Sequence, residues 1–94
     1  MEMPVITECA VEGCAYNQGL ACHALAITVG DARHAHCDTY LQAPLKGGDP
    51  SANGRVGACK MSDCRHNVGL ECRASGITVG FHQSDIDCLT YAPA

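Results

Sequence analysis

The sequence predicts a small cysteine-rich fold that is stapled by metal and built from two tandem mini-domains. Three observations predict it. The chain has only 94 residues, and 8 of them are cysteines. It contains no Trp and a single Phe, so large apolar side chains are scarce. A cysteine-bounded segment also occurs twice. Units of fewer than about 40 residues usually need disulfides, a metal or oligomerisation to stay folded.

The segment that begins at Cys9 is repeated from Cys59. Both copies follow the pattern C-x4-C-x2-N-x-G-L-x-C-x-A-x2-I-T-V-G, then a variable stretch, then C-x-T-Y. The offset is 50 up to Gly30 and Gly80 (80 − 30), and 51 at Cys37 and Cys88 (88 − 37). Chance does not produce so many matches. The shared residues are therefore those that the unit needs to fold or to function.

These repeats divide the chain into a first four-cysteine unit (1–40), a linker (41–58) and a second unit (59–94). The linker is rich in Gly and Pro, which favours turns and irregular structure. If it is flexible, it spans roughly 20–25 Å, so the units could face each other or sit apart. We expect them to pack as a pseudo-twofold pair.

Within each unit we expect mostly loop, with short antiparallel β-hairpins. In the first copy, residues 17–19 would form a three-residue loop with Gly19 in the left-handed conformation. That register places Cys14 opposite Cys22, and Tyr16 opposite Leu20. The segment ITVG at 27–30 predicts a short strand that buries its Ile and Val and ends at its Gly.

The cysteine spacing favours metal. Four thiolates from separate segments can enclose a tetrahedral Zn²⁺ with bonds of about 2.3 Å. Such a site closes the chain on itself and supplies folding energy. Iron, alone or in a cluster, suits the same ligands and is the second choice. Two disulfides per unit, or free redox-active thiols, are the alternatives. The chain shows no export signal or membrane span, so we expect a cytoplasmic protein with reduced thiols.

Other functions are disfavoured. The formal net charge is −4, whereas nucleic-acid binding needs a basic patch. No catalytic set is repeated, and four thiolates around zinc leave no open position for a substrate. We therefore predict that the chain is not an enzyme. None of the five histidines has a histidine at the equivalent position of the other copy, so we do not expect them in a shared metal site.

These residues resemble the bacterial four-cysteine family called "domain of unknown function 1540", in two tandem copies. The likeness lies in CAVEGCAYN of the first copy, CKMSDCRHN of the second, and the final C-x-T-Y of each. His66 departs from it, because the family has Tyr there. The resemblance implies two metal-ligand sets, one in each copy: Cys9, Cys14, Cys22 and Cys37, and Cys59, Cys64, Cys72 and Cys88. It implies no established activity.

The sequence thus predicts a non-enzymatic zinc-binding module with two structural four-cysteine sites, two Zn²⁺ per chain and a protein partner. One alternative is a metal or redox handling protein that uses the same thiolates as a buffer, sensor or store. Another is a disulfide-stapled scaffold. The pattern leaves open whether each metal would be bound within one repeat or between repeats, and it does not define the oligomeric state.

Overall fold

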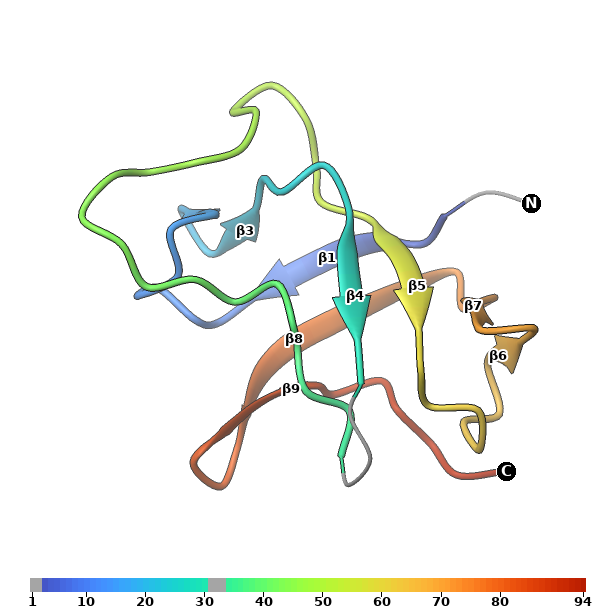
Figure 1. Cartoon of the computed structure of the whole chain (residues 1–94). Helices are drawn as coiled ribbons and strands as arrows, with labels where there is room; N and C mark the ends of the chain where they lie inside the picture. The colour runs from blue at the N-terminus through green and yellow to red at the C-terminus, as the bar shows by residue number, and fades with distance from the viewer. Residues whose placement is uncertain (1–2, 31–33) are drawn as a thin grey trace.

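The computed structural model describes residues 3–30 and 34–94, and within them the chain forms short strands joined by turns, without a helix (Figure 1). The strands of the first copy are β1 (Val5–Cys9), β2 (Asn17–Gln18), β3 (Ala21–Cys22) and β4 (Ile27–Val29). Those of the second are β5 (Val56–Cys59), which begins in the last residues of the predicted linker, β6 (Asn67–Val68), β7 (Glu71–Cys72), β8 (Gly76–His82) and β9 (Asp85–Cys88). The predicted small, all-strand and loop fold is therefore present.

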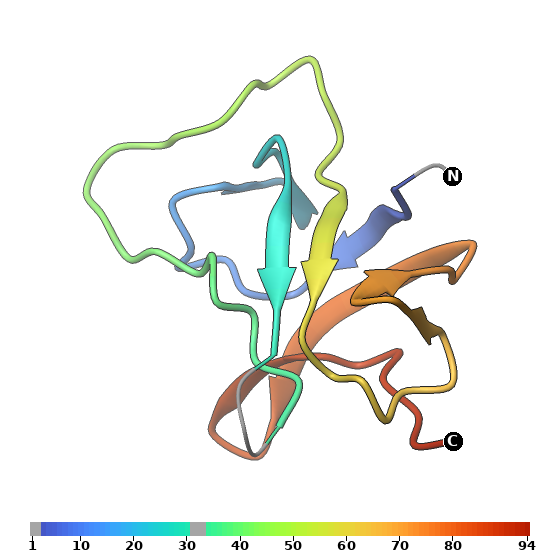
Figure 2. The ribbon, with the colours of Figure 1, turned by 45° about the vertical axis from the view of Figure 1, so that its right-hand side comes forward.

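The two copies pair with each other through parallel strands. β1 of the first copy pairs with β8 of the second, which places Cys9 opposite Val79. β5 of the second copy pairs with β4 of the first, which places Cys59 opposite Val29. Figures 1 and 2 show β4 and β5 side by side in both views. The sequence predicted antiparallel hairpins within the copies, and it did not predict this parallel pairing between them.

A second seam joins the copies where residues 35–37 run antiparallel to β9. Cys37 N–H donates to the carbonyl of Ile86, and Cys88 N–H donates to the carbonyl of Ala35, both at 2.8 Å. The two bonds are reciprocal, because Cys37 and Cys88 are equivalent in the repeat, as are Ala35 and Ile86. Reciprocal contacts at both seams are what a twofold relation between the copies requires.

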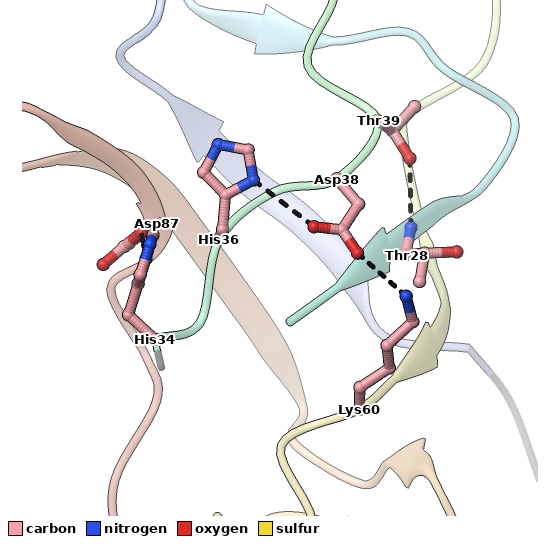
Figure 3. Close-up of polar contacts among 7 residues, drawn as sticks. All are labelled: Thr28, His34, His36, Asp38, Thr39, Lys60 and Asp87. Carbon is pink, nitrogen blue, oxygen red and sulfur yellow. Dashed lines mark hydrogen bonds and ion pairs between the residues drawn. The ribbon is translucent and has the colours of Figure 1, made fainter. Parts of the chain in front are cut away.

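Polar side chains also connect the copies along this seam (Figure 3). His34 Nδ1 lies 2.8 Å from Oδ1 of the buried Asp87. Lys60 Nζ lies 3.3 Å from Asp38 Oδ2, at an exposed position. The exposed pair contributes little to stability, whereas the contact to Asp87 supplies a partner for a carboxylate removed from water.

One buried cluster unites the apolar side chains of both copies with most of the cysteines. Its largest fully buried members are Val29 of the first copy and Val56 and Ile77 of the second. Neither copy is rich enough in large side chains to enclose a core alone. Because the strands cross between copies, each copy's strands are covered by the other's.

The tight hairpins differ from the prediction in register, because the partner of Cys22 is Asn17 and not Cys14. β2 and β3 pair Asn17 with Cys22 and Gln18 with Ala21, so Cys22 does not lie opposite Cys14. The loop has two residues, Gly19 (φ 61°) and Leu20 (φ 63°), instead of three. Two successive residues with positive φ match the twist of a two-residue hairpin.

Leu20 adopts this left-handed conformation despite its side chain, which costs about 1–2 kcal/mol. Its carbonyl accepts a hydrogen bond from Cys9 N–H at 3.0 Å. The second copy repeats both features, with Leu70 at φ 67° and its carbonyl bonded to Cys59 N–H at 2.9 Å. The turn therefore fixes the backbone of the first cysteine of each copy.

The ITVG strands are present, with alternate residues buried as predicted. β4 ends before Gly30. β8 instead continues through Gly80, so the prediction that the glycine ends the strand is wrong in the second copy. There β9 pairs with β8 and extends it. A Cβ at position 80 would lie 2.9 Å from a methyl carbon of Leu89, so the glycine allows this close packing.

The linker packs along the first copy and is not a free spacer. Gly47 N–H donates to the Ala15 carbonyl at 2.8 Å, and Asp49 N–H donates to the His23 carbonyl at 2.9 Å. Gly48 has a φ of 83°, and a Cβ there would lie 2.1 Å from the same His23 oxygen. Only glycine fits this close backbone crossing.

Candidate metal centres

The four cysteines of each copy meet at one small cavity. Those of the first copy, which all line its wall, are Cys9, Cys14, Cys22 and Cys37. Those of the second copy line a matching cavity and are Cys59, Cys64, Cys72 and Cys88. Each cavity has a volume of about 20 Å³, enough for one particle of the size of a water molecule. The structure therefore brings each predicted set together within its own copy and not between copies.

Different segments supply the four sulfurs. In the first copy Cys9 ends β1, Cys14 lies in the following turn and Cys22 ends β3. Cys37 comes from the segment that pairs with β9 of the other copy. A bond from all four sulfurs to one ion would tie the tight hairpin to both seams between the copies.

The two cavities are built from twelve equivalent positions. Eight of these carry the same residue in both copies: the four cysteines and the Ile, Val, Thr and Tyr of the shared motifs. The other four positions differ. With the residue of the first copy's cavity given first, they are Ile6/Val56, Val11/Met61, Tyr16/His66 and Ile86/Ala35. In the last pair each cavity borrows its residue from the other copy.

All eight cysteines are free thiols, and most of them are buried. Burial is the main cause that raises the pKa of Cys37 and of Cys88 from 9.0 to about 11. The charges of neighbouring cysteines raise it further; Cys14 and Cys22 do so for Cys37. The same two causes raise the pKa of Cys22 and Cys72. Four thiolates can therefore share this space at neutral pH only if a cation compensates their charge.

Backbone N–H groups partly oppose this effect by donating to the sulfurs. Ala24 N–H donates to the sulfur of Cys22, and both Thr39 and Tyr40 donate to that of Cys37, which lowers the thiol pKa in each case. Equivalent N–H groups serve Cys72 and Cys88 in the second copy. Such donors stabilise the thiolate. Because these donors are backbone groups, they require the spacing from the cysteine and not a particular side chain.

The shared Asn and Thr residues hold the cysteine segments in place. Asn17 Nδ2 donates to the Cys9 carbonyl at 2.8 Å, and Asn67 does the same for Cys59 at 2.9 Å. Thr39 Oγ1 accepts a bond from Thr28 N–H at 3.1 Å (Figure 3). The sequence pattern assigned Asn17 only to the turn. An Asn stands eight residues after the first cysteine in both copies, which indicated that it matters. The sequence alone did not show that this Asn binds the carbonyl of that cysteine.

Gly54 is a part of the first centre that sequence reasoning missed. A Cβ at this position would lie 2.6 Å from the sulfur of Cys22 and 3.0 Å from its Cβ. Gly54 N–H also donates to the Cys22 carbonyl at 2.7 Å. In the sequence Gly54 is one of several linker glycines, so nothing distinguished it.

The donor set fits a soft or borderline metal such as zinc. Four sulfurs from separate segments, a cavity of one-ion size and N–H donors to sulfur are all present. In residues 3–30 and 34–94, however, no three His, Cys, Asp or Glu side chains already stand in the positions of a metal-ligand group. The four cysteines of each copy nevertheless line one cavity at equivalent positions. Metal binding would require the thiols to lose their protons.

Most histidines have other contacts. His23 Nδ1 lies 2.7 Å from the Ala52 carbonyl oxygen, and His34 and His36 lie close to Asp87 and Asp38. His66 is the exception, because it lines the cavity of the second copy beside the four cysteines.

Comparison with known proteins agrees with the repeat. No curated protein and no solved structure shows significant similarity to the chain. Within the described ranges, we find no helix with the length and apolar character needed to cross a membrane. The model of a family described as Domain of Unknown Function (DUF1540) matches residues 7–40 and again residues 58–91. These matches cover more than half of the chain, which therefore belongs to the DUF1540 family and carries two tandem copies of its domain.

Proposed function

We propose that this chain is a non-enzymatic zinc-binding module with two structural four-cysteine sites. The observation that carries the proposal is that the four cysteines of each copy line one cavity, at equivalent positions in both copies. Each site would hold one Zn²⁺, giving two per chain. Iron would suit the same sulfurs and is the second choice of metal.

A structural role follows from the ligand count. Four thiolates complete the tetrahedral shell of zinc and leave no position for water or a substrate. When bound, the metal would supply positive charge among four buried sulfurs and crosslink segments that are far apart in sequence. Because the apolar core is small, such crosslinks would provide much of the folding free energy.

The purpose of such a module would be to present a surface to a protein partner. The net charge of −4 does not favour nucleic acid. Large apolar side chains are exposed, with Leu25 at 69%, Leu45 at 78% and Phe81 at 57%. Exposed apolar side chains mark a protein contact where they form one contiguous patch. The proposal implies a compartment that keeps thiols reduced, such as the cytoplasm.

Metal or redox handling is the second candidate, and one observation favours it. Cys72 and Cys88 are partly exposed, whereas Cys22 and Cys37 are buried. Accessible thiols suit a buffer, sensor or store better than a closed structural site does. The disulfide-stapled scaffold is the third candidate, since neighbouring thiols can be oxidised to pairs.

Removal of the metal tests the structural role. Zinc-loaded protein is treated with a chelator while its fold is followed by near-ultraviolet circular dichroism and by amide NMR spectra. A structural site predicts loss of the folded signal together with the metal, and its recovery when zinc is returned. A chain that loses both ions and keeps its folded spectrum contradicts the structural role and favours metal handling.

Single-cysteine variants test the ligand sets. Cys22→Ser should abolish the metal of the first copy, and the matched variant Cys72→Ser that of the second, each leaving one zinc per chain. A Cys22→Ser chain that retains two zinc ions and full stability would contradict the assignment of four thiolate ligands to the first site.

A further inference from the structure

The linker covers one face of the hairpin segment of the first copy (residues 15–24). Gly47 N–H donates to the carbonyl of Ala15 at 2.8 Å, and Asp49 N–H donates to that of His23 at 2.9 Å. Both acceptors are backbone groups, so they depend on the shape of the hairpin and not on its side chains. The first copy therefore shows how this hairpin binds an extended segment.

The second copy builds the same hairpin segment, with Arg65 and Arg73 in place of Ala15 and His23. Arg73 N–H donates to the His66 carbonyl at 2.7 Å, and the equivalent bond of the first copy is 2.8 Å long. In the part of the chain that the structure describes, no hydrogen bond reaches the carbonyl of Arg65 or that of Arg73. The acceptors are thus present in the second copy without a segment that binds them.

Exposure shows the same difference at positions where both copies carry the same residue. Asn17 is 3% exposed and Ala24 is 2% exposed in the first copy. Their equivalents Asn67 and Ala74 are partly exposed. Because the residue types are identical, the difference lies in what surrounds them. The face that is covered in the first hairpin segment is open in the second.

Both copies lead the chain back to this hairpin after the C-x-T-Y motif. Ala15 N–H donates to the Leu41 carbonyl at 2.6 Å, and Arg65 N–H donates to the equivalent Ala92 carbonyl at 2.7 Å. In the first copy the chain then continues as PLKGGDP, residues 44–50, and crosses the face. No described segment takes this place in the second copy.

Two features define the segment that fits such a face. Gly48 has to be glycine, because a Cβ there would lie 2.1 Å from the His23 carbonyl oxygen. Bonds from Ser51 lower the pKa of Asp49, and the charge of His23 lowers it as well, so this carboxylate lies within electrostatic range of position 23. Arg73 stands at the equivalent position of the second copy and is always charged. It therefore favours an acidic residue in the docked segment.

We propose that the hairpin face of the second copy (residues 65–74) docks an extended segment of a partner protein, in which two glycines are followed by an acidic residue. This inference deepens the proposed role of presenting a surface to a protein partner and rests on that role. The segment donates backbone N–H groups to the carbonyls of Arg65 and Arg73. Its carboxylate pairs with the Arg73 guanidinium.

Titration of the full-length chain with the linker sequence as a free peptide tests the proposal. The probe is PLKGGDP, residues 44–50 with both ends blocked, and amide NMR spectra follow the titration. The signals of His66 and Ala74 should shift and saturate, because their N–H groups belong to the same peptide units as the accepting carbonyls. Those of Tyr16 and Ala24 should stay in place, because the linker already covers the first hairpin segment.

A changed peptide and two protein variants serve as controls. A peptide with alanine in place of its second glycine should cause no shift, because its Cβ would strike the Arg73 carbonyl. Arg73→Ala should weaken binding by up to about fivefold, as expected for an exposed ion pair. Lys60→Ala removes a charge that pairs with Asp38 and should leave the affinity unchanged. Full binding of the alanine peptide, or equal losses in the two variants, would overturn the assignment.

The same seven residues appended after Ala94 would raise the local concentration of the segment and reveal a contact too weak to detect with the free peptide. Shifts of His66 and Ala74 in both experiments would support the docking face. Absence of shifts in both would overturn it. Shifts with the appended segment alone would show that the face accepts only its own chain, which overturns docking of a partner.

The zinc content of the same samples separates this inference from the proposed metal sites. Two zinc ions per chain without peptide binding would overturn the docking face and leave the zinc module intact. Peptide binding by a chain without zinc would support the docking face and contradict the proposed metal sites.

Discussion

Several individual residues that the two copies share hold the cysteines in place. Asn17 and Asn67 bind the carbonyl of the first cysteine, and Leu20 and Leu70 accept its N–H. Ala24 and its counterpart donate to the third sulfur. The repeat could therefore identify residues that matter without revealing what each contacts, because most of these contacts use the backbone.

Gly54→Ala should damage the first centre selectively. The new Cβ would lie 2.6 Å from the sulfur of Cys22, so the cysteine or the linker must shift. We expect a loss of about 1–3 kcal/mol in unfolding free energy, and weaker zinc binding in the first copy only. Chemical denaturation and metal titration measure both effects. Gly13→Ala is the control, because a Cβ there meets nothing within 4 Å; equal effects of the two variants would contradict the account.

The dependence of stability on pH should reverse when metal is removed. The raised pKa of Cys37 and Cys88, from 9.0 to about 11, means that the metal-free folded chain holds its thiol protons more tightly than the unfolded chain. That contribution is complete below about pH 9 and is lost as the pH rises through about 11. The metal-loaded chain should instead weaken as the pH falls, because protons compete for the thiolates. Thermal unfolding with and without chelator, in acidic and alkaline buffer, measures both trends. Parallel trends would contradict the prediction.

At the scale of elements, the sequence predicted the existence of strands better than their pairing. The ITVG strand and the hairpin between the second and third cysteines are present in both copies. The hairpin register was wrong, because the prediction gave positive φ to Gly19 alone and the structure gives it to Leu20 as well. Leucine at such a position contradicts local preference, and it is the contact of its carbonyl with Cys9 that supports it.

The threonines of C-x-T-Y should stabilise both copies equally. Thr39 Oγ1 accepts the N–H of Thr28, and Thr90 Oγ1 accepts that of Thr78, each at 3.1 Å. Substitution by Val keeps the shape and leaves the N–H without its partner, which costs about 1–3 kcal/mol. Denaturant unfolding of Thr39→Val and Thr90→Val should show similar losses. Ser51→Ala, which removes an exposed linker bond to Asp49, should cost much less.

At the scale of the whole molecule, strands that cross between copies make the two repeats one body. The parallel pairs β1–β8 and β4–β5 join segments from opposite copies, and one buried cluster includes both. The sequence pattern within one copy could not reveal the pairing between copies. The residues of a strand do not identify a partner strand about 70 residues away. The cysteine sets were predictable because the copies repeat them, whereas the contact of Gly54 with Cys22 required the fold.

A break in the linker should leave the two halves together. Leu45 is 78% exposed, so a protease recognition sequence inserted beside it should be cut without disturbing either seam. The cut protein should elute from size-exclusion chromatography as one species that contains both fragments, since the parallel pairs and the shared core remain. Uncut protein carrying the same insertion is the control. Separation of the fragments under native conditions would show that the seams do not hold the copies together.

Native mass spectrometry tests the central claim most directly. The full chain is purified under reducing conditions without added metal, and its mass is measured both in the native state and after denaturation. We predict two zinc ions per chain, with the denatured mass of eight reduced thiols. A metal-free chain whose denatured mass is lower by two hydrogens per disulfide would contradict the account and make this protein an oxidised scaffold.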